Sequence, residues 1–308
     1  MMAHRGGTTL SSVLAVLLVG AGCATAPVAP RLDEAQAQVF ELPAEAVSPP
    51  AQADQLFVLG ATGVDVSNRY LSTVVVTTDE ASGMCSGVLI SPRLVLTAGH
   101  CVCGRRRVTH AAGASGTEID GSQCASKAFA TVTAYEPTKA KSQYSMLPRI
   151  YQGSVRPHGE LKIHLDAQDN VVSSRADLAL ILLEEAVAGV GVAQLAGSEV
   201  RQEEALVMVG YGADKTDLGE AMPGFRRYGT NAVTQVRPPE EGLFVMEKEG
   251  AHSYAGDSGG PCFREDKKGR WLVGISARGT GKVSRFTSTY RYKAWLEQEI
   301  KLAAKRKT

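Results

Sequence analysis

The chain has 308 residues, of which 44% are hydrophobic and 21% are charged. These values are ordinary for a soluble globular protein, and they exclude wholesale disorder and a membrane protein with many spans. The 33 basic and 32 acidic residues leave a formal charge of +1, so the overall positive charge that nucleic-acid binding requires is missing, and we expect no nucleic-acid partner.

The first element in chain order has the form of an export signal. Arg5 precedes an apolar stretch over residues 10–19, which small residues follow up to Cys23. The apolar stretch is short for a membrane span, so we interpret residues 1–22 as a signal peptide. Its end is similar to the lipobox of bacterial lipoproteins, which predicts lipidation of Cys23 and attachment to a membrane. Cleavage after Ala26, at an Ala-Thr-Ala triplet, is the alternative.

Residues 23–56 have the composition of a tether or pro-segment, because they contain five prolines and few large apolar side chains. From residue 57 to residue 308 the composition is that of a folded domain. Short β-like runs bounded by Gly, Pro, Ser and Asp occur at 71–78, 87–90, 94–97, 178–183, 205–209 and 271–275. Many short strands of this kind indicate an all-β barrel or sandwich.

One helix is expected at the end of the domain, over residues 288–305. Five apolar side chains can form one face of it: Tyr292, Trp295, Leu296, Ile300 and Leu302. The segment 104–174 gives no clear pattern, and we expect strands with surface insertions there.

Three short segments carry the residue types of nucleophilic catalysis. They read Leu-Thr-Ala-Gly-His-Cys at 96–101, Ala-Asp-Leu-Ala-Leu-Ile at 176–181 and Gly-Asp-Ser-Gly-Gly-Pro at 256–261. A chance match to six specified residues, as in the third segment, has a likelihood of roughly 10⁻⁷ per position. Together, in this order, the segments closely resemble the His, Asp and Ser segments of the chymotrypsin/trypsin family of serine proteases.

The resemblance implies a fold and a set of roles. The fold is all-β, with two six-stranded antiparallel β-barrels over about 57–185 and 195–287, followed by the C-terminal helix. Ser258 is the expected nucleophile and His100 its general base, because a serine hydroxyl needs a neighbouring imidazole to take its proton. Asp177 orients the imidazole, and the backbone N–H groups of Gly256 and Ser258 form the oxyanion hole. This chemistry requires no cofactor and no metal.

The six cysteines fit an exported protein in which pairing is the default. The resemblance implies a disulfide between Cys85 and Cys101, next to the catalytic histidine. A second disulfide between Cys103 and Cys124 would close a loop of about 20 residues and add about 3 kcal/mol of stability. Cys262 then remains as a buried free thiol. The competing interpretation is a zinc site made of Cys85, Cys101, Cys103 and Cys124.

Activation is one point at which the chain departs from the family. In similar enzymes a newly freed apolar N-terminus pairs with the Asp beside the catalytic Ser, which here is Asp257. The corresponding stretch begins at Phe57, but no Lys or Arg lies between Arg31 and Arg69. A trypsin-like cut is therefore unavailable, and we expect processing by another protease near Leu56 or Phe57.

The substrate pocket is a second departure. The resemblance places His252, Ser253, Ala277, Arg278 and Gly279 around it, without the Asp that selects Lys or Arg. These residues fit either a pocket for an acidic side chain or a small mixed pocket.

The expected function is that of a serine endopeptidase that hydrolyses polypeptides as a monomer. The protein would be secreted, periplasmic or anchored to a bacterial membrane. Two other classes remain open: a catalytically silent binding protein on the same fold, and an esterase that uses Ser258. The esterases with a Gly-x-Ser-x-Gly elbow place their Asp and His after the serine, whereas both precede it here.

Overall fold

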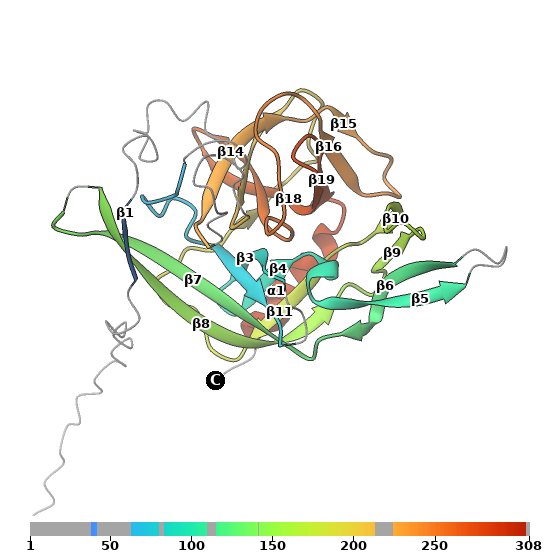
Figure 1. The fold of residues 1–308 in the computed structure, drawn as a ribbon, viewed down its shortest axis with the longest axis horizontal. Coiled ribbons are helices and arrows are strands. Elements are labelled where there is room, and N and C mark those ends of the chain that lie inside the picture. Colours follow the sequence, from blue (N-terminus) through green and yellow to red (C-terminus); the bar gives the residue numbers. More distant parts are fainter. Residues whose placement is uncertain are drawn as a thin grey trace, which may run out of the picture. The chain divides into compact units, whose positions relative to one another are not determined.

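The computed structural model describes residues 38–41, 63–79, 83–109, 115–140, 142–212 and 224–305. The expected signal peptide, the lipidation site at Cys23 and the expected mature N-terminus at Phe57 lie outside these residues. Within the described part, no helix has both the length and the apolar character needed to span a membrane. The same residues form three sheets and one α-helix (Figure 1).

The first sheet closes into a barrel of six strands. Its order is β8-β11-β4-β3-β2-β7, and a further ladder between β7 and β8 closes the ring. The strands are β2 (Thr73–Thr77), β3 (Cys85–Ser91), β4 (Leu94–Thr97), β7 (Lys127–Pro137), β8 (Gln143–Pro157) and β11 (Ala179–Leu183). A short strand from the predicted tether, β1 (Gln38–Glu41), adds to the edge of β8, so part of that segment has regular structure.

Strand β11 is buried at every position because it packs on both faces. Ala179, Ile181 and Leu183 point into the first barrel's core, whereas Leu180 and Leu182 belong to a second cluster that contains Phe263 and Leu272 of the other sheet. Burying each such aliphatic side chain stabilises the fold by about 1.5–3 kcal/mol. The continuous apolar run at 178–183 is therefore the sequence signature of a strand between two cores.

A small sheet of four strands occupies the segment that gave no clear pattern in the sequence. Its order is β10-β9-β6-β5. The strands are β5 (Cys103–Thr109), β6 (Ser115–Cys124), β9 (Lys162–Leu165) and β10 (Val171–Arg175). This sheet carries the disulfide between Cys103 and Cys124, which pair directly across β5 and β6.

The third sheet has eight strands and differs from the second closed barrel that the resemblance implies. Its order is β14-β13-β17-β18-β19-β16-β15, with β12 parallel to β18. Among the described residues no ladder joins β14 to β15, but the two follow one another in the chain with only residues 233 and 234 between them. The sheet's two ends are thus linked by the chain and not by a ladder. The strands are β12 (Gln194–Leu195), β13 (Ala205–Gly210), β14 (Arg227–Ala232), β15 (Gln235–Val236), β16 (Leu243–Met246), β17 (Pro261–Asp266), β18 (Gly269–Gly279) and β19 (Ser284–Ser288).

The C-terminal helix α1 (Lys293–Lys305) begins five residues later than the sequence predicts. Residue 288 instead ends β19, whose pairing with both β16 and β18 outweighs its local helical pattern. Leu296 and Ala303 bury the helix against the cluster shared by the two sheets, whereas Leu302, expected on the apolar face, is 42% exposed.

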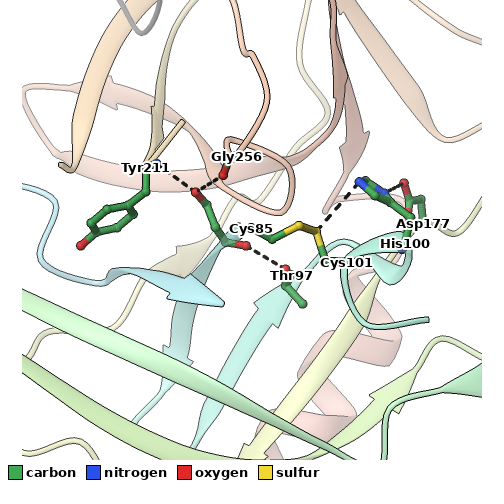
Figure 2. Close-up of a disulfide and its surroundings, with 8 residues drawn as sticks. Cys85, Thr97, His100, Cys101, Asp177, Tyr211 and Gly256 are labelled. Atoms are coloured by element: carbon green, nitrogen blue, oxygen red, sulfur yellow. Dashed lines mark hydrogen bonds and ion pairs between the residues drawn. A yellow bond between two sulfur atoms is a disulfide. The ribbon is translucent and has the colours of Figure 1, made fainter. Parts of the chain in front are cut away.

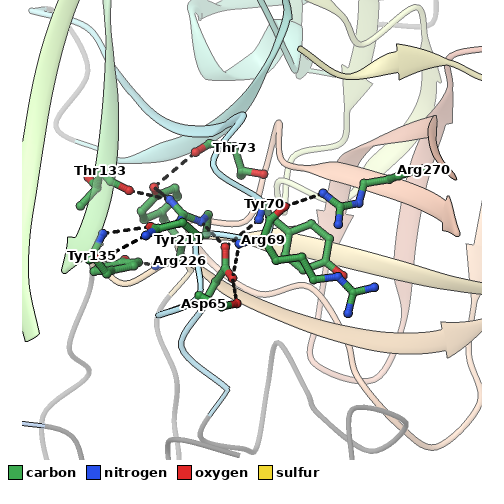
Figure 3. Close-up of polar contacts among 11 residues, drawn as sticks. Asp65, Arg69, Tyr70, Thr73, Thr133, Tyr135, Tyr211, Arg226 and Arg270 are labelled. Atoms are coloured by element: carbon green, nitrogen blue, oxygen red, sulfur yellow. Dashed lines mark hydrogen bonds and ion pairs between the residues drawn. The ribbon is translucent and has the colours of Figure 1, made fainter. Parts of the chain in front are cut away.

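A buried ion pair fastens residues 63–70 to the rest of the domain (Figure 3). The guanidinium of Arg226 donates through Nε to Asp65 Oδ2 at 2.8 Å, and both side chains are 0% exposed. Arg226 also donates to the carbonyl of Thr133 on β7 and to the hydroxyl of Tyr211. The Asp65 carboxylate accepts a further hydrogen bond from the backbone N–H of Tyr70. Every charge in this cluster therefore has a partner, which a charge buried this deeply requires.

Candidate active site

The fold brings His100 and Asp177 together through one antiparallel ladder. His100 lies in the 3-10 turn η4 (Gly99–Cys101), directly after β4, and Asp177 lies just before β11. Because Thr97 pairs with Ala179, the end of β4 lies beside the start of β11. Residues 77 apart in sequence are thus neighbours in space, as the resemblance implies.

Asp177 accepts two hydrogen bonds from His100, one from the imidazole and one from the backbone (Figure 2). The imidazole Nδ1 of His100 lies 2.7 Å from Asp177 Oδ2, and the backbone N–H of His100 donates to Oδ1 at 2.9 Å. The Asp177 side chain is 0% exposed and that of His100 is 19% exposed. Burial alone would raise the pKa of Asp177, but the charge and hydrogen bonds of His100, together with the charge of Arg278, hold that pKa below its usual value.

The depressed pKa of Asp177 predicts how stability depends on pH. The ionised carboxylate stabilises the folded state above the unfolded pKa of about 3.9, and this contribution is lost as the pH falls through the lower folded pKa. We expect the difference in free energy of unfolding between the wild type and Asp177→Asn to be constant at neutral pH and to shrink below about pH 4. Urea titrations at several pH values measure it, and a difference that grows in acid would contradict the assignment.

Ser258 lies in a loop whose glycines are required by close contacts. Gly256 and Gly259 have φ of +98° and +80°, a region that other residues rarely adopt. A Cβ on Gly259 would lie 2.2 Å from the carbonyl oxygen of Ser86 and 2.2 Å from Thr97 Oγ1. The Ser258 loop therefore packs directly on strands β3 and β4, which lead to His100.

Two polar residues hold this loop in place, Ser86 and Thr97 (the latter in Figure 2), and the sequence analysis singled out neither. The backbone N–H of Ser86 donates to the carbonyl of Ser258 at 2.7 Å, and its hydroxyl donates to the carbonyl of Gly256 at 2.8 Å. Thr97 Oγ1 donates to the carbonyl of Ser86 at 2.8 Å. Their place beside Cys85 and His100 was the available signal, but a buried serine or threonine has no distinctive pattern in a sequence.

The carboxylate of Asp257 also fixes the Ser258 loop. Its Oδ1 accepts the backbone N–H of Gly212 at 2.8 Å, and its Oδ2 accepts that of Tyr254 at 2.9 Å. The N–H groups of Gly256 and Ser258 donate no hydrogen bond to another described residue, so they are available to a ligand. No hydrogen bond joins the hydroxyl of Ser258 to His100 within the described part of the chain. Such bonds are often long in a free enzyme and shorten when substrate binds.

Comparisons with known proteins identify the family and the fold. A family model described as the trypsin-like peptidase domain matches residues 85–275, which include all three segments. The chain belongs to the trypsin-like peptidase family. It is also similar in fold to a solved structure of kallikrein-related peptidase 10 in complex with Zn²⁺, with a TM-score of 0.50 and 16% identity. The match covers 76% of this chain and 97% of that one, and at this identity it concerns the fold alone. No curated protein matches the sequence.

The cysteines of this trypsin-like domain form the two disulfides that the sequence analysis expects, Cys85–Cys101 and Cys103–Cys124. The alternative zinc site is therefore wrong, because sulfur atoms in disulfides are not thiolate ligands. Cys262 is free and fully buried, and burial raises the pKa of its thiol well above the usual value, so it is unreactive.

The residues expected around the substrate pocket of the trypsin-like domain separate into two groups. His252 is 5% exposed, and its ring nitrogens lie 3.2 Å from Ser284 Oγ and 2.9 Å from the carbonyl of Lys248. Burial lowers the pKa of His252, which favours the neutral ring. Both ring nitrogens are engaged, so His252 offers no free donor to a substrate carboxylate. The expectation that His252 helps to bind an acidic side chain is therefore corrected.

The other four residues of the expected pocket do not line one common cavity. Gly279 packs against Ser253, since a Cβ on Gly279 would lie 1.9 Å from the Ser253 carbonyl oxygen. Ala277 and Arg278, which precede Gly279 on β18, instead line a cavity of about 720 Å³ that His252, Ser253 and Gly279 do not line.

Proposed function

We propose that this protein is a serine endopeptidase in which Ser258 is the nucleophile. The 2.7 Å contact between His100 Nδ1 and Asp177 Oδ2 is the observation that carries the proposal. It fixes the tautomer of the imidazole, because Nδ1 keeps its proton for the carboxylate and Nε2 is left to accept one. A neutral Nε2 is what a serine hydroxyl needs in order to become a nucleophile at neutral pH.

The reaction proceeds in two displacements. Ser258 Oγ attacks the peptide carbonyl carbon while His100 Nε2 takes its proton, and the imidazolium is stabilised by Asp177. The N–H groups of Gly256 and Ser258 donate to the resulting oxyanion. The C–N bond then breaks as His100 returns the proton to the leaving amine, which gives an acyl ester on Ser258. Water, deprotonated by the same imidazole, hydrolyses the ester. No cofactor enters either step.

The rival class is a binding protein that has kept the fold and lost catalysis. Such proteins usually lack one member of the triad, whereas His100, Asp177 and Ser258 all remain in this chain. The N–H groups of Gly256 and Ser258 donate to no acceptor in the part of the chain that the structure describes, and this further favours the enzyme, because an oxyanion hole requires free backbone donors.

The proposal extends to processing and export. Residues 1–22 act as a signal peptide, Cys23 carries the lipid in the exported precursor, residues 23–56 form the pro-segment, and the peptidase domain covers 57–308 after cleavage near Phe57. The two disulfides support an oxidising compartment outside the cytosol. N-terminal sequencing of the active protein tests the cut, and an active form that begins at the signal-peptide junction would refute it.

Labelling with a fluorophosphonate tests the proposed function. This reagent phosphonylates a serine hydroxyl that a neighbouring base activates, so we expect one modified residue, Ser258, after peptide mapping. The Ser258→Ala protein is the control and should remain unlabelled. Modification of a different serine, or no modification of the folded wild type, would return the question to the binding class.

The Ser258 loop also gives a prediction about geometry. A methyl group in Gly259→Ala would meet Ser86 and Thr97 at 2.2 Å, at a φ that alanine rarely adopts. A shift of about 1 Å in the nucleophile lowers kcat/KM on the order of 10²-fold. Gly197→Ala is the matched control, because a Cβ there meets nothing within 4 Å. Equal peptidase activity of the two variants would show that the loop does not position Ser258.

A further inference from the structure

A cavity of about 720 Å³ lies between strand β10 and strands β16, β18 and β19, beside the proposed active site. Ala277 and Arg278 of β18 line one side of it, and residues 169–174 line another. The cavity lies close to the nucleophile. The backbone N–H of Gly259, the residue after Ser258, donates to the carbonyl of Ser276 at 2.7 Å, and the residue after Ser276, Ala277, lines the cavity. Its occupant therefore lies near a bond held at Ser258.

Arginines dominate the charge of this cavity. Arg237, Arg278 and Arg285 line it, and none of the three forms an ion pair with another described residue. Two carboxylates also line it. Asp169 is already paired with Arg105 at 3.0 Å, so Glu241 alone faces three arginines. The cavity therefore has an excess of positive charge, which the single carboxylate of Glu241 offsets only in part.

Arg278 is the most constrained of the three. It is partly buried, and its Nε is a buried donor without a hydrogen-bond acceptor among the described residues. Burial and the charges of Arg105 and Arg285 lower the pKa of Arg278, while Asp177 acts in the opposite direction. A guanidinium nevertheless stays protonated, so it retains an unsatisfied donor among like charges. A bound anion would satisfy the donor and offset the repulsion.

We propose that this cavity binds the carboxylate side chain of an Asp or Glu that lies within a few residues of the cleaved peptide bond. This inference rests on the proposed peptidase function and names its substrate class. A carboxylate suits the site because a guanidinium can donate two parallel hydrogen bonds to it. The residues that select the substrate are then Arg278, Arg285 and Arg237 in place of the occupied His252.

Paired peptides test the proposal through hydrolysis. Each pair carries Glu or Gln at one position near the cleaved bond, and both ends are blocked so that no terminal carboxylate can bind instead. We expect kcat/KM to favour the Glu peptide at one position at least, by about tenfold or more. The preference should fall about tenfold in Arg285→Gln, fall also in Arg237→Gln and rise in Glu241→Gln.

Arg107→Gln is the matched control, because Arg107 is an exposed arginine on β5 without an ion pair among the described residues. It should leave the Glu-to-Gln preference unchanged. A wild type without preference, or a preference that survives in both Arg285→Gln and Arg237→Gln, would overturn the inference.

Binding measurements separate this inference from the proposed function. Fluorescein-labelled forms of the same peptides are titrated with the Ser258→Ala protein, in which no turnover occurs, and anisotropy gives the dissociation constants. We expect tighter binding of the Glu peptide and loss of the difference on adding Arg285→Gln. If this holds while the wild type hydrolyses nothing, the cavity does bind the carboxylate and the peptidase assignment is wrong. Equal binding of the two peptides would show that the cavity does not recognise a carboxylate, whatever the wild type hydrolyses.

Discussion

Replacement of Ser258 by Ala is expected to reduce kcat for peptide hydrolysis by about 10⁶-fold while the protein remains folded. The hydroxyl is the group that forms the acyl ester, so no other residue of the site can take its place. Ser258 is only partly buried and its hydroxyl makes no hydrogen bond to another described residue, so its loss should change stability little. Steady-state kinetics and a urea titration of the same preparation measure both effects.

Ser126→Ala controls for the substitution itself, since Ser126 is an exposed serine between β6 and β7. Its kcat should equal that of the wild type. Peptide hydrolysis by Ser258→Ala at more than about one hundredth of the wild-type rate would mean that the activity belongs to another group or to a contaminant.

Replacement of Arg226 by Met should lower the free energy of unfolding by about 3–5 kcal/mol. The variant leaves the Asp65 carboxylate without its ion-pair partner, at a position that is 0% exposed. It also removes the hydrogen bonds of Arg226 to Thr133 and Tyr211, which join the residue before β14 to strand β7 and to the loop after β13. The loss should be seen as a lower urea midpoint with little change in slope.

The control is Arg175→Met, which removes an ion pair to Glu160 whose side chains are 57% and 54% exposed. An exposed pair of this kind contributes at most about 1 kcal/mol. The double variant Asp65→Asn/Arg226→Met should lose less stability than the sum of its two single variants, because it leaves no unpaired charge. Additive losses, or a cost for Arg226→Met no greater than that for Arg175→Met, would show that the buried pair does not hold the domain together.

The parts of the fold that the sequence predicted best are those with continuous apolar runs. Strand β4 occupies the predicted 94–97, and β11 lies within the predicted 178–183, because both are buried at every position and Thr97 is their one polar residue. The antiparallel pairing of these two strands then follows from the resemblance, and with it the contact between His100 and Asp177.

Strands were expected between residues 104 and 174, but their positions could not be predicted, for a physical reason. Strand β5 is exposed at five of its seven positions, and β8 is only partly buried at most of its length. Their stability comes from pairing with distant segments, such as the long ladder between β7 and β8, so no local apolar alternation marks them.

The engagement of His252 depends on similar long-range contacts. Its partner Ser284 lies 32 residues away on β19, and only the folded sheet brings the two together. The sequence therefore located His252 in the chain, but it could not show that both ring nitrogens already have partners within the protein.

A crystal structure of the fluorophosphonate adduct tests the central claim most directly, because it traps a tetrahedral centre on the nucleophile. We predict a bond from phosphorus to Ser258 Oγ, with one phosphoryl oxygen accepting hydrogen bonds of about 2.7–3.1 Å from the N–H groups of Gly256 and Ser258. His100 should retain its contact with Asp177 and turn Nε2 toward the adduct. An adduct oxygen that points to solvent, with the imidazole out of reach of Ser258, would contradict the assignment of this chain as a serine peptidase.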